Sequence, residues 1–403
     1  MHRELVEQKR WISETRFLHA LNYCMVLPGP EAQQLVTYIG WLMHRTWGGI
    51  VAGALFVLPS LAVLIALSWI YMAFGNVPAI AGALYGVKPA VTAIVLHAAW
   101  RIGSRALKSP PLWAIAAAAF VAIYVFAVPF PAIVLAAGLI GALGGRIAPR
   151  QFATGGAHAA LAAGHARAVI DDNTPSPEHA RFRWSRLAAV VAISLLLWAG
   201  TLGALVAAFG AQGVLPQMAW FFTKAALVTF GGAYAVLPYV VQGAVGGFGW
   251  LTAPQMIDGL ALGETTPGPL IMVVQFVGFL GGWNQPGTLS PLAMATLGAA
   301  ITTWTTFIPC FLWIFLGAPH IEQLRGNARL GSTLTCVTAA VVGVILNLAV
   351  WFGLHVFWPR ANLTDWFAIV VSVAAFGAMQ FFRVGIIPIV VASGVLGLAW
   401  SFV

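Results

Sequence analysis

Long runs of apolar residues, separated by short polar stretches, make up most of the chain. They cover residues 17–40, 47–74, 77–100, 110–128, 130–144, 186–210, 216–248, 256–283, 291–317, 331–358, 364–379 and 384–402. Several are long enough for a membrane-spanning helix, which needs about 20 apolar residues. VPFPA and QFFRVG each join two shorter runs and predict tight hairpins over 110–144 and 364–402. The pattern predicts an all-α, polytopic transmembrane protein.

Composition and charge agree with a lipid environment. Only 8% of the residues are charged and 60% are hydrophobic, whereas about 25% are charged in a soluble domain. The net charge of +9 comes from short basic clusters between apolar runs, which favours positive cytoplasmic loops over nucleic-acid binding. Cys24, Cys310 and Cys336 lie in apolar runs without C-x-x-C spacing, so we interpret them as packing residues and predict no disulfide, metal or cofactor.

One long polar stretch, residues 145–185, divides the chain and contains TPSPE. It predicts a flexible cytoplasmic linker. The basic loop with Arg101, Arg105 and Lys108 is expected on the same side of the membrane. No carboxylate or cysteine is placed to complete a metal site with His158 and His165, so a solvated linker is preferred for this stretch.

An internal repeat relates the two halves of the chain. At an offset of 239 residues, Trp250 falls on Trp11, and the Pro-Gly-Pro at 267–269 falls on the one at 28–30. Further matches follow an insertion: FIPCFLWIF with FVLPSLAVL, and VTAAV with VTAIV. We therefore predict one homologous repeat in residues 1–144 and another in 186–403.

The orientation of the two repeats depends on how many runs cross the membrane. If every run crosses, seven lie between Trp11 and Trp250, and this odd number inserts the copies upside down relative to each other. If the Pro-Gly-Pro runs only dip in and return, six crossings separate the two tryptophans. Inverted repeats are typical of transporters, and we expect them here.

Each repeat contains a Pro-Gly-Pro break inside an apolar run, at LPGPEAQQ (27–34) and at ETTPGPLI (264–271). Proline and glycine interrupt a helix there, and the freed backbone groups must be buried in protein or line a watery cavity. Paired breaks at corresponding positions indicate a transporter's substrate site. A half-helix that starts after the second proline favours an anion. The alternative is a kink that serves packing only.

Few ionisable residues occur in the apolar runs, and each is expensive at membrane depth, by about 2.5–3.5 kcal/mol for Asp, Lys or Arg. Lys88 and Lys224 are candidates for holding a dianion, although Lys224 can instead snorkel to the membrane interface. Glu264 or Glu31 is our candidate for a coupling proton, followed by Asp258, because an acid kept from water can titrate near neutral pH. His19 and His97 are interpreted as packed or interfacial side chains.

Three stretches carry a resemblance to a known family: WISETRFLHALNYCMVLPGPEAQQLVTYIGW, FTKAALVTFGGAYAVLPYV and LTAPQMIDGLALGETTPGPLIMVVQFVGF. With them, nearly all of the chain except the linker resembles the long-chain, two-domain form of the chromate ion transporter family. The resemblance implies a multi-pass carrier of the bacterial inner membrane. It also implies that the carrier exports chromate with the proton-motive force and confers chromate resistance.

The resemblance also assigns site residues. The family's signature falls on Pro28, Gly29, Pro30, Glu31, Gly231, Gly232, Pro267, Gly268 and Pro269, and we add the adjacent Thr265 and Thr266 to the predicted substrate site. The expected partners are chromate or a similar oxyanion, a coupling proton and the lipid bilayer, and a homodimer stays open. A sulfate or other oxyanion carrier is the alternative. No G-x-S-x-G, H-E-x-x-H or Walker motif supports an enzyme.

The start of the first repeat raises a separate question. In the second half, ALVTFGGAYAVLPYVVQ precedes the break, and the offset of 239 places its Gly231 and Gly232 ahead of Met1. Either the first copy of this segment was lost, or Met1 is internal and translation starts upstream. We favour the second explanation, because MHRELVEQKRW has the character of a loop that leaves a membrane segment.

Overall fold

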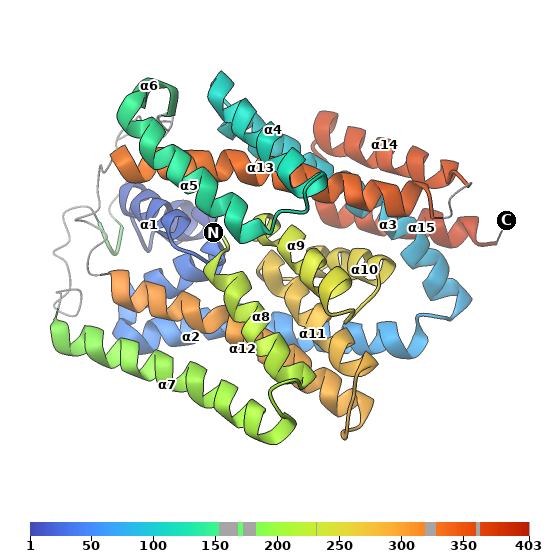
Figure 1. The fold of residues 1–403 in the computed structure, drawn as a ribbon, viewed down its shortest axis with the longest axis horizontal. Coiled ribbons are helices and arrows are strands. Elements are labelled where there is room, and N and C mark those ends of the chain that lie inside the picture. Colours follow the sequence, from blue (N-terminus) through green and yellow to red (C-terminus); the bar gives the residue numbers. More distant parts are fainter. Residues whose placement is uncertain (153–167, 172–182, 231, 319–327, 360–362, 403) are drawn as a thin grey trace.

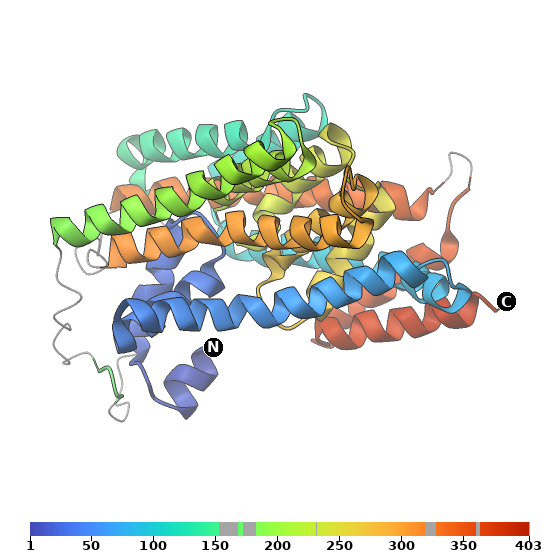
Figure 2. The ribbon, with the colours of Figure 1, turned by 90° about the horizontal axis from the view of Figure 1, so that it is seen from below.

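The computed structural model describes residues 1–152, 168–171, 183–230, 232–318, 328–359 and 363–402. Most of its helices lie along the long axis of the molecule (Figures 1 and 2). Six described helices are long and apolar enough to cross a membrane: Glu31–Phe74, Pro78–Ala106, Phe130–Ile147, Trp184–Phe209, Pro291–Gly317 and Gly331–Phe357. The predicted helical, polytopic membrane fold is confirmed.

The elements of the first half follow the predicted apolar runs, with breaks where the sequence places proline and glycine. They are the π-helix η1 (Arg3–Gln8), α1 (Glu14–Val26), α2 (Glu31–Phe74), α3 (Pro78–Ala106), α4 (Pro110–Tyr124), α5 (Phe130–Ile147) and the short α6 (Pro149–Phe152). Helices α4 and α5 are joined by a turn at VPFPA, where proline occupies the first turn of α5. Both pack mainly on α13 (Ala328–Phe357) and little on each other, so they do not form the predicted tight hairpin.

The second half begins with a long helix on the periphery and contains more short helices. Its elements are α7 (Trp184–Phe209), α8 (Val214–Leu227), α9 (Ala233–Val241), the π-helix η3 (Gln242–Gly247), α10 (Ala253–Thr265), the 3-10 helix η4 (Leu270–Met272), α11 (Val273–Asn284), α12 (Pro291–Gly317), α13 (Ala328–Phe357), α14 (Trp366–Phe381) and α15 (Ile386–Trp400). Helices α14 and α15 are likewise joined by a turn, but both pack mainly on α3 and little on each other.

The two halves have the same local backbone, as the sequence repeat predicts. At the offset of 239 residues, α1 coincides with α10, and η1 coincides with η3, end for end. The caps correspond as well: Ser13 accepts a hydrogen bond from the backbone N–H of Arg16, and Thr252 accepts one from that of Gln255. This agreement in turns, caps and helix ends confirms that the halves are structural repeats.

The Pro-Gly-Pro runs dip in and return instead of crossing. Within the range of α2 the chain reverses direction at His44 and Arg45, where Arg45 has a φ of +57°. The part before the reversal folds back on the part after it, so that the backbones of Gly40 and Gly48 face each other. In the second repeat α11 and α12 form the equivalent hairpin, with Gly278 facing the backbone of Gly298.

The repeats are inverted, although the reason differs from the predicted count of seven crossings. The run at 216–248 is not one segment, because α8 and α9 form another hairpin that returns to the end it entered from (Figure 1). Five predicted runs then remain between Trp11 and Trp250, which is still an odd number. In Figures 1 and 2 the hairpin around the first break points in from the end near the linker, and α10 with α11 points in from the opposite end.

The described part of the linker is attached to the first repeat. Ile170 forms a parallel bridge with Ile12, and the backbone N–H of Ser13 donates to the carbonyl of Ile170 at 2.9 Å. At the same end, Ser109 donates to the carbonyl of Gln151 at 2.7 Å, so the basic loop before α4 and the start of the linker lie together, as predicted. His158, His165 and TPSPE lie outside the described residues.

Candidate functional site

The first break lies between α1 and α2 and is closed, which means that its backbone is shielded from solvent. Gly29 has a φ of +123°, a conformation that L side chains rarely adopt. Its N–H donates to the carbonyl of Thr229 at 2.8 Å, and the Gln34 side chain donates to the carbonyl of Pro28 at 2.8 Å. Gly29 and Pro30 are buried. The freed backbone of this break is therefore satisfied within the protein.

The second break, between α10 and η4, has the same backbone conformation but is open, which means that part of it is exposed to solvent. Gly268 has a φ of +140°, and Thr266 has the extended conformation that Leu27 has in the first break. The hydroxyls of Thr265 and Thr266 donate to carbonyls of their own helix. Pro267 and Gly268 are exposed. Because lipid cannot satisfy a broken backbone, an open break at membrane depth is expected to line a water-accessible space.

Each break packs against the long helix of the other repeat. A Cβ placed on Gly29 would meet Cys310 Sγ of α12 at 2.8 Å, and one placed on Gly268 would meet Ser60 Cβ of α2 at 2.6 Å. Cys310 directly follows Pro309, and Ser60 directly follows Pro59. The two breaks thus meet equivalent positions of the opposite repeat, and this reciprocal contact holds the two repeats together at the centre.

A third break, between α8 and α9, connects the other two. Gly232 has a φ of +99° and precedes α9, while Gly231 lies outside the described residues. The carbonyl of Thr229 in this break accepts the hydrogen bond from Gly29. The Tyr234 hydroxyl on α9 donates a hydrogen bond to the carboxylate of Glu264, three residues before Pro267. Gly232 and the predicted residues of both Pro-Gly-Pro breaks therefore border one central region.

The sequence-based prediction missed the polar residues that join these breaks. Thr229 and Ser60 are fully or almost fully buried, and the Ser60 hydroxyl has no hydrogen-bond partner among the described residues. Thr229 and Tyr234 flank the FGG motif, which we noted in the sequence as a signature and not as a helix break. A glycine pair within an apolar run was the available signal.

The predicted acids have different surroundings. Glu264 is held by Tyr234, whereas no described residue forms a hydrogen bond or ion pair with Glu31, which begins α2 directly after the first break. Asp258 lies away from the breaks, in the first half of α10, and only 3% of its side chain is exposed. The side chain of His19 is not among those described.

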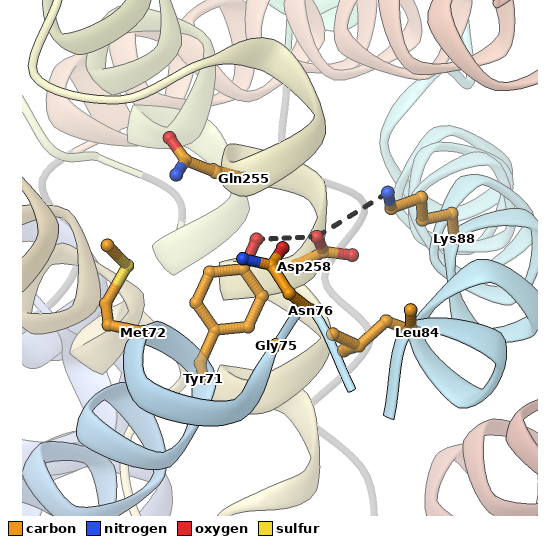
Figure 3. A pocket seen from close by; sticks show the side chains of 9 residues that line it. Tyr71, Met72, Gly75, Asn76, Leu84, Lys88, Gln255 and Asp258 are labelled. Atoms are coloured by element: carbon orange, nitrogen blue, oxygen red, sulfur yellow. Dashed lines mark hydrogen bonds and ion pairs between the residues drawn. The ribbon is translucent and has the colours of Figure 1, made fainter. Parts of the chain in front are cut away.

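Lys88 pairs with Asp258 across the two repeats. Lys88 Nζ on α3 lies 3.6 Å from Asp258 Oδ2 on α10, and the Tyr71 hydroxyl on α2 donates to the same oxygen at 2.9 Å. Figure 3 shows the two side chains reaching the carboxylate from different sides. They line a cavity of about 290 Å³, which we call the Lys88 pocket: Tyr71, Met72, Gly75, Asn76, Ala81, Leu84, Lys88, Gln255 and Asp258.

Lys224 and His97 do not join the central region. Lys224 lies near the end of α8, is exposed, and places its Nζ 5.8 Å from the ring centre of Trp220. This outward contact corresponds to the alternative in which the lysine does not face the substrate. His97 packs edge-on against Phe376, with 6.1 Å between ring centroids, as expected for a packed side chain.

The central region has the features of a transporter's substrate site. Among the described residues, no three His, Cys, Asp or Glu side chains gather as a metal site would require. The region instead offers interrupted helices, freed backbone groups and a single tyrosine-held carboxylate. With the inverted repeats, these features define a membrane transporter of the broken-helix class.

Comparison with known proteins identifies the family within this class. The chromate transporter family model matches residues 1–142 and 216–398, and the chain belongs to this family of transport proteins, which are not enzymes. The chromate transport protein of Pseudomonas aeruginosa is 32% identical over 86% of this chain and 73% of its own length. That of Cupriavidus metallidurans is 28% identical over 87% and 76%. No solved structure matches the chain.

Proposed function

We propose that this protein exports chromate across the bacterial inner membrane and confers chromate resistance. The observation that carries the proposal is the meeting of three helix breaks at the centre of inverted repeats, in a chain that belongs to the chromate transporter family. Relatives named as chromate transport proteins support the choice of substrate. The proposed repeats are residues 1–144 and 186–403.

The proposed substrate position is the open face of the second break. Gly268 allows close approach of an anion to the backbone, and the N–H groups at the start of the following half-helix present positive partial charge. The first break is closed by Thr229, so the site is asymmetric although the repeats match. Pro28, Gly29, Pro30 and Glu31 then support the site from the opposite repeat, while Thr265, Thr266, Pro267 and Pro269 shape its open side.

Proton coupling is proposed to run through Glu264. Its carboxylate lies three residues before Pro267 and accepts the Tyr234 hydroxyl hydrogen bond, which ties its charge state to the position of α9. A proton gained or lost there changes the charge next to the anion. Glu31, which faces no described charged partner, is the second candidate, and Asp258 is the third.

The linker end of the molecule is proposed to face the cytoplasm. The end of α5 lies there (Figure 1), and the loop after α3 is held to it through Ser109 and Gln151. These segments carry Arg101, Arg105, Lys108 and Arg146, and cytoplasmic loops carry such an excess of positive charge. The opposite end, with the turn between α2 and α3, then faces outward. Sulfate or another oxyanion is the alternative substrate, since a site built from backbone N–H groups recognises charge and size more than the central atom.

Flux into inverted vesicles tests the proposed function. Vesicles that contain the protein should take up chromate, take it up faster when a proton gradient is imposed, and lose part of the flux when sulfate is in excess. Empty vesicles are the control. If the vesicles carry sulfate but take up no chromate under any condition, the substrate is sulfate and not chromate. Absence of both fluxes would refute an oxyanion carrier.

A further inference from the structure

We propose that the Lys88 pocket is a second anion site, in which a tetrahedral oxyanion competes with the Asp258 carboxylate for Lys88. The proposal rests on the proposed function, because it takes an oxyanion as the cargo. The pocket lies between the turn from α2 to α3 of one repeat and α10 of the other. That turn is at the end of the molecule opposite the linker (Figures 1 and 2).

The ion pair in the pocket has the geometry of an exchangeable contact. A charge-assisted N–H···O hydrogen bond is about 2.7–2.9 Å long, whereas Lys88 Nζ lies 3.6 Å from Asp258 Oδ2. The same oxygen also accepts from Tyr71, and the buried Asp258 Oδ1 has no hydrogen-bond partner among the described residues. A buried pair that served stability alone would be expected to satisfy its remaining polar atoms.

The cavity that Lys88 lines has room and further donors for an oxyanion beside the ion pair. The Lys88 side chain is 27% exposed, and an ammonium has three donors. Gln255 uses its Oε1 to accept the backbone N–H of Thr252, which leaves its amide N–H₂ for a ligand, and Asn76 adds a second amide. A cavity of about 290 Å³ has room for a small anion with water, since a water molecule occupies about 30 Å³ in the liquid.

Competition for Lys88 links anion binding to the proton on Asp258. The ionised carboxylate holds the ammonium and repels an anion, whereas the protonated acid does neither, so the affinity for the anion should rise as the pH falls. The other elements packed on α10 bring few titratable groups. Tyr71 on α2 and Lys88 on α3 face Asp258, α11 and α15 carry no titratable residue, and His355 on α13 contacts the carbonyl of Trp351.

The test measures chromate and sulfate binding to the purified full chain between pH 6 and 8, using the ions themselves as probes. Asp258→Asn should tighten anion binding about tenfold near pH 8, because it removes the carboxylate that competes for Lys88, and attraction between opposite charges 4–6 Å apart is worth about one to three pKa units. It should also flatten the pH dependence of binding. Asp365→Asn is the same change at an acid that caps α14 outside the pocket, and it should leave the anion affinity and its pH dependence unchanged.

A double variant separates an anion site from a structural ion pair. Asp258→Asn with Lys88→Gln removes both charges, so a structural role predicts a protein that folds and binds like the wild type. If the pocket is an anion site, the double variant should lack the tighter anion binding that Asp258→Asn shows alone. The proposal is overturned if the single and double variants bind the anion with equal affinity, or if Asp258→Asn binds it with the affinity of the wild type.

Sidedness provides a second readout and keeps the two proposals distinct. In oriented vesicles, Asp258→Asn should change the half-saturating anion concentration on the side opposite the linker only, and a change on the linker side alone contradicts the inference. If the wild-type chain neither binds nor carries chromate or sulfate, the proposed function itself fails. If the wild type transports and the variants do not differ from it, only the second site fails.

Discussion

At the scale of single residues, two glycines determine the shape of the central site. Gly29 and Gly268 have φ values of +123° and +140°, where a side chain is strained by about 1–3 kcal/mol. A Cβ would also collide with Cys310 or Ser60 on the long helix of the other repeat. Conformation and packing both require glycine at these two positions.

Replacing Gly268 or Gly29 by valine should abolish chromate export while the protein still inserts into the membrane, because the change strains only a central turn. Chromate resistance of cells and protein abundance in membranes measure the two effects. Gly200→Val is the matched control, since nothing lies within 4 Å of a Cβ at Gly200 on the peripheral α7. Normal resistance in both break variants would contradict a shared site at the breaks.

The proposed coupling of transport to protons is tested at Glu264, whose carboxylate accepts a hydrogen bond from Tyr234. Glu264→Gln keeps the shape and a hydrogen bond to Tyr234 but removes the titratable group, so flux should no longer respond to a pH gradient. Chromate uptake by inverted vesicles at several imposed gradients measures this response. If Glu264→Gln and Glu31→Gln both respond like the wild type, the coupling proton binds elsewhere, and Asp258 is the next residue to replace.

At the scale of elements, equivalent segments of the two repeats are anchored differently. Both loops before the broken hairpins have the same backbone, with Arg10 at a φ of +51° and Gly249 at +60°. Trp250 is fully buried and stacks on Phe248 at 4.5 Å between ring centroids, whereas Trp11 is 38% exposed. The second hairpin is fixed by an aromatic cluster, and the first is fixed by its backbone bridge to Ile170.

These anchors predict unequal effects for one substitution at two matched positions. Trp250→Ala should destabilise the protein by about 3–5 kcal/mol, the range for loss of a buried aromatic side chain. Trp11→Ala should have a much smaller effect, because its ring is already partly exposed. Thermal unfolding in detergent compares the two variants. Equal losses would show that the loop before α1 is as tightly packed as its counterpart.

At the scale of the whole molecule, the returning hairpins determine the topology. The turns of α8–α9 and of both Pro-Gly-Pro runs lie inside the protein, and α2, α3 and α7 connect the two ends (Figure 1). This arrangement places Asn76, after α2, and Thr288, after α11, at one end, with Lys108, after α3, at the other. A chain in which every apolar run crossed would place Asn76 on the same side as Trp11.

Cysteine labelling distinguishes these topologies. In a cysteine-free background, Asn76→Cys and Thr288→Cys should react with a membrane-impermeant maleimide from one side, and Lys108→Cys and Trp11→Cys from the other. Intact cells and inverted vesicles provide the two sides. Labelling of positions 76 and 11 from the same side would mean that the first Pro-Gly-Pro run crosses the membrane.

The sequence by itself determined the features that depend on local chemistry. Apolar runs identify lipid as the solvent, proline and glycine at Pro28, Gly29 and Gly268 interrupt helices wherever they occur, and a repeated sequence produces repeated turns and caps. The offset of 239 residues therefore predicted the equivalence of α1 and α10 end for end. The family resemblance came from the same motifs.

Only the tertiary structure decided which distant residues meet. Tyr71 and Asp258 are 187 residues apart, and nothing in their local sequence pairs them or assigns Lys88 to the same carboxylate. The third break at Gly232 was hidden because two glycines in an apolar run are compatible with a continuous helix. The inversion likewise depended on whether each run crosses or returns. A returning hairpin is stable only where other helices cover its broken backbone or enclose the watery space that it lines, which is a property of the assembled protein.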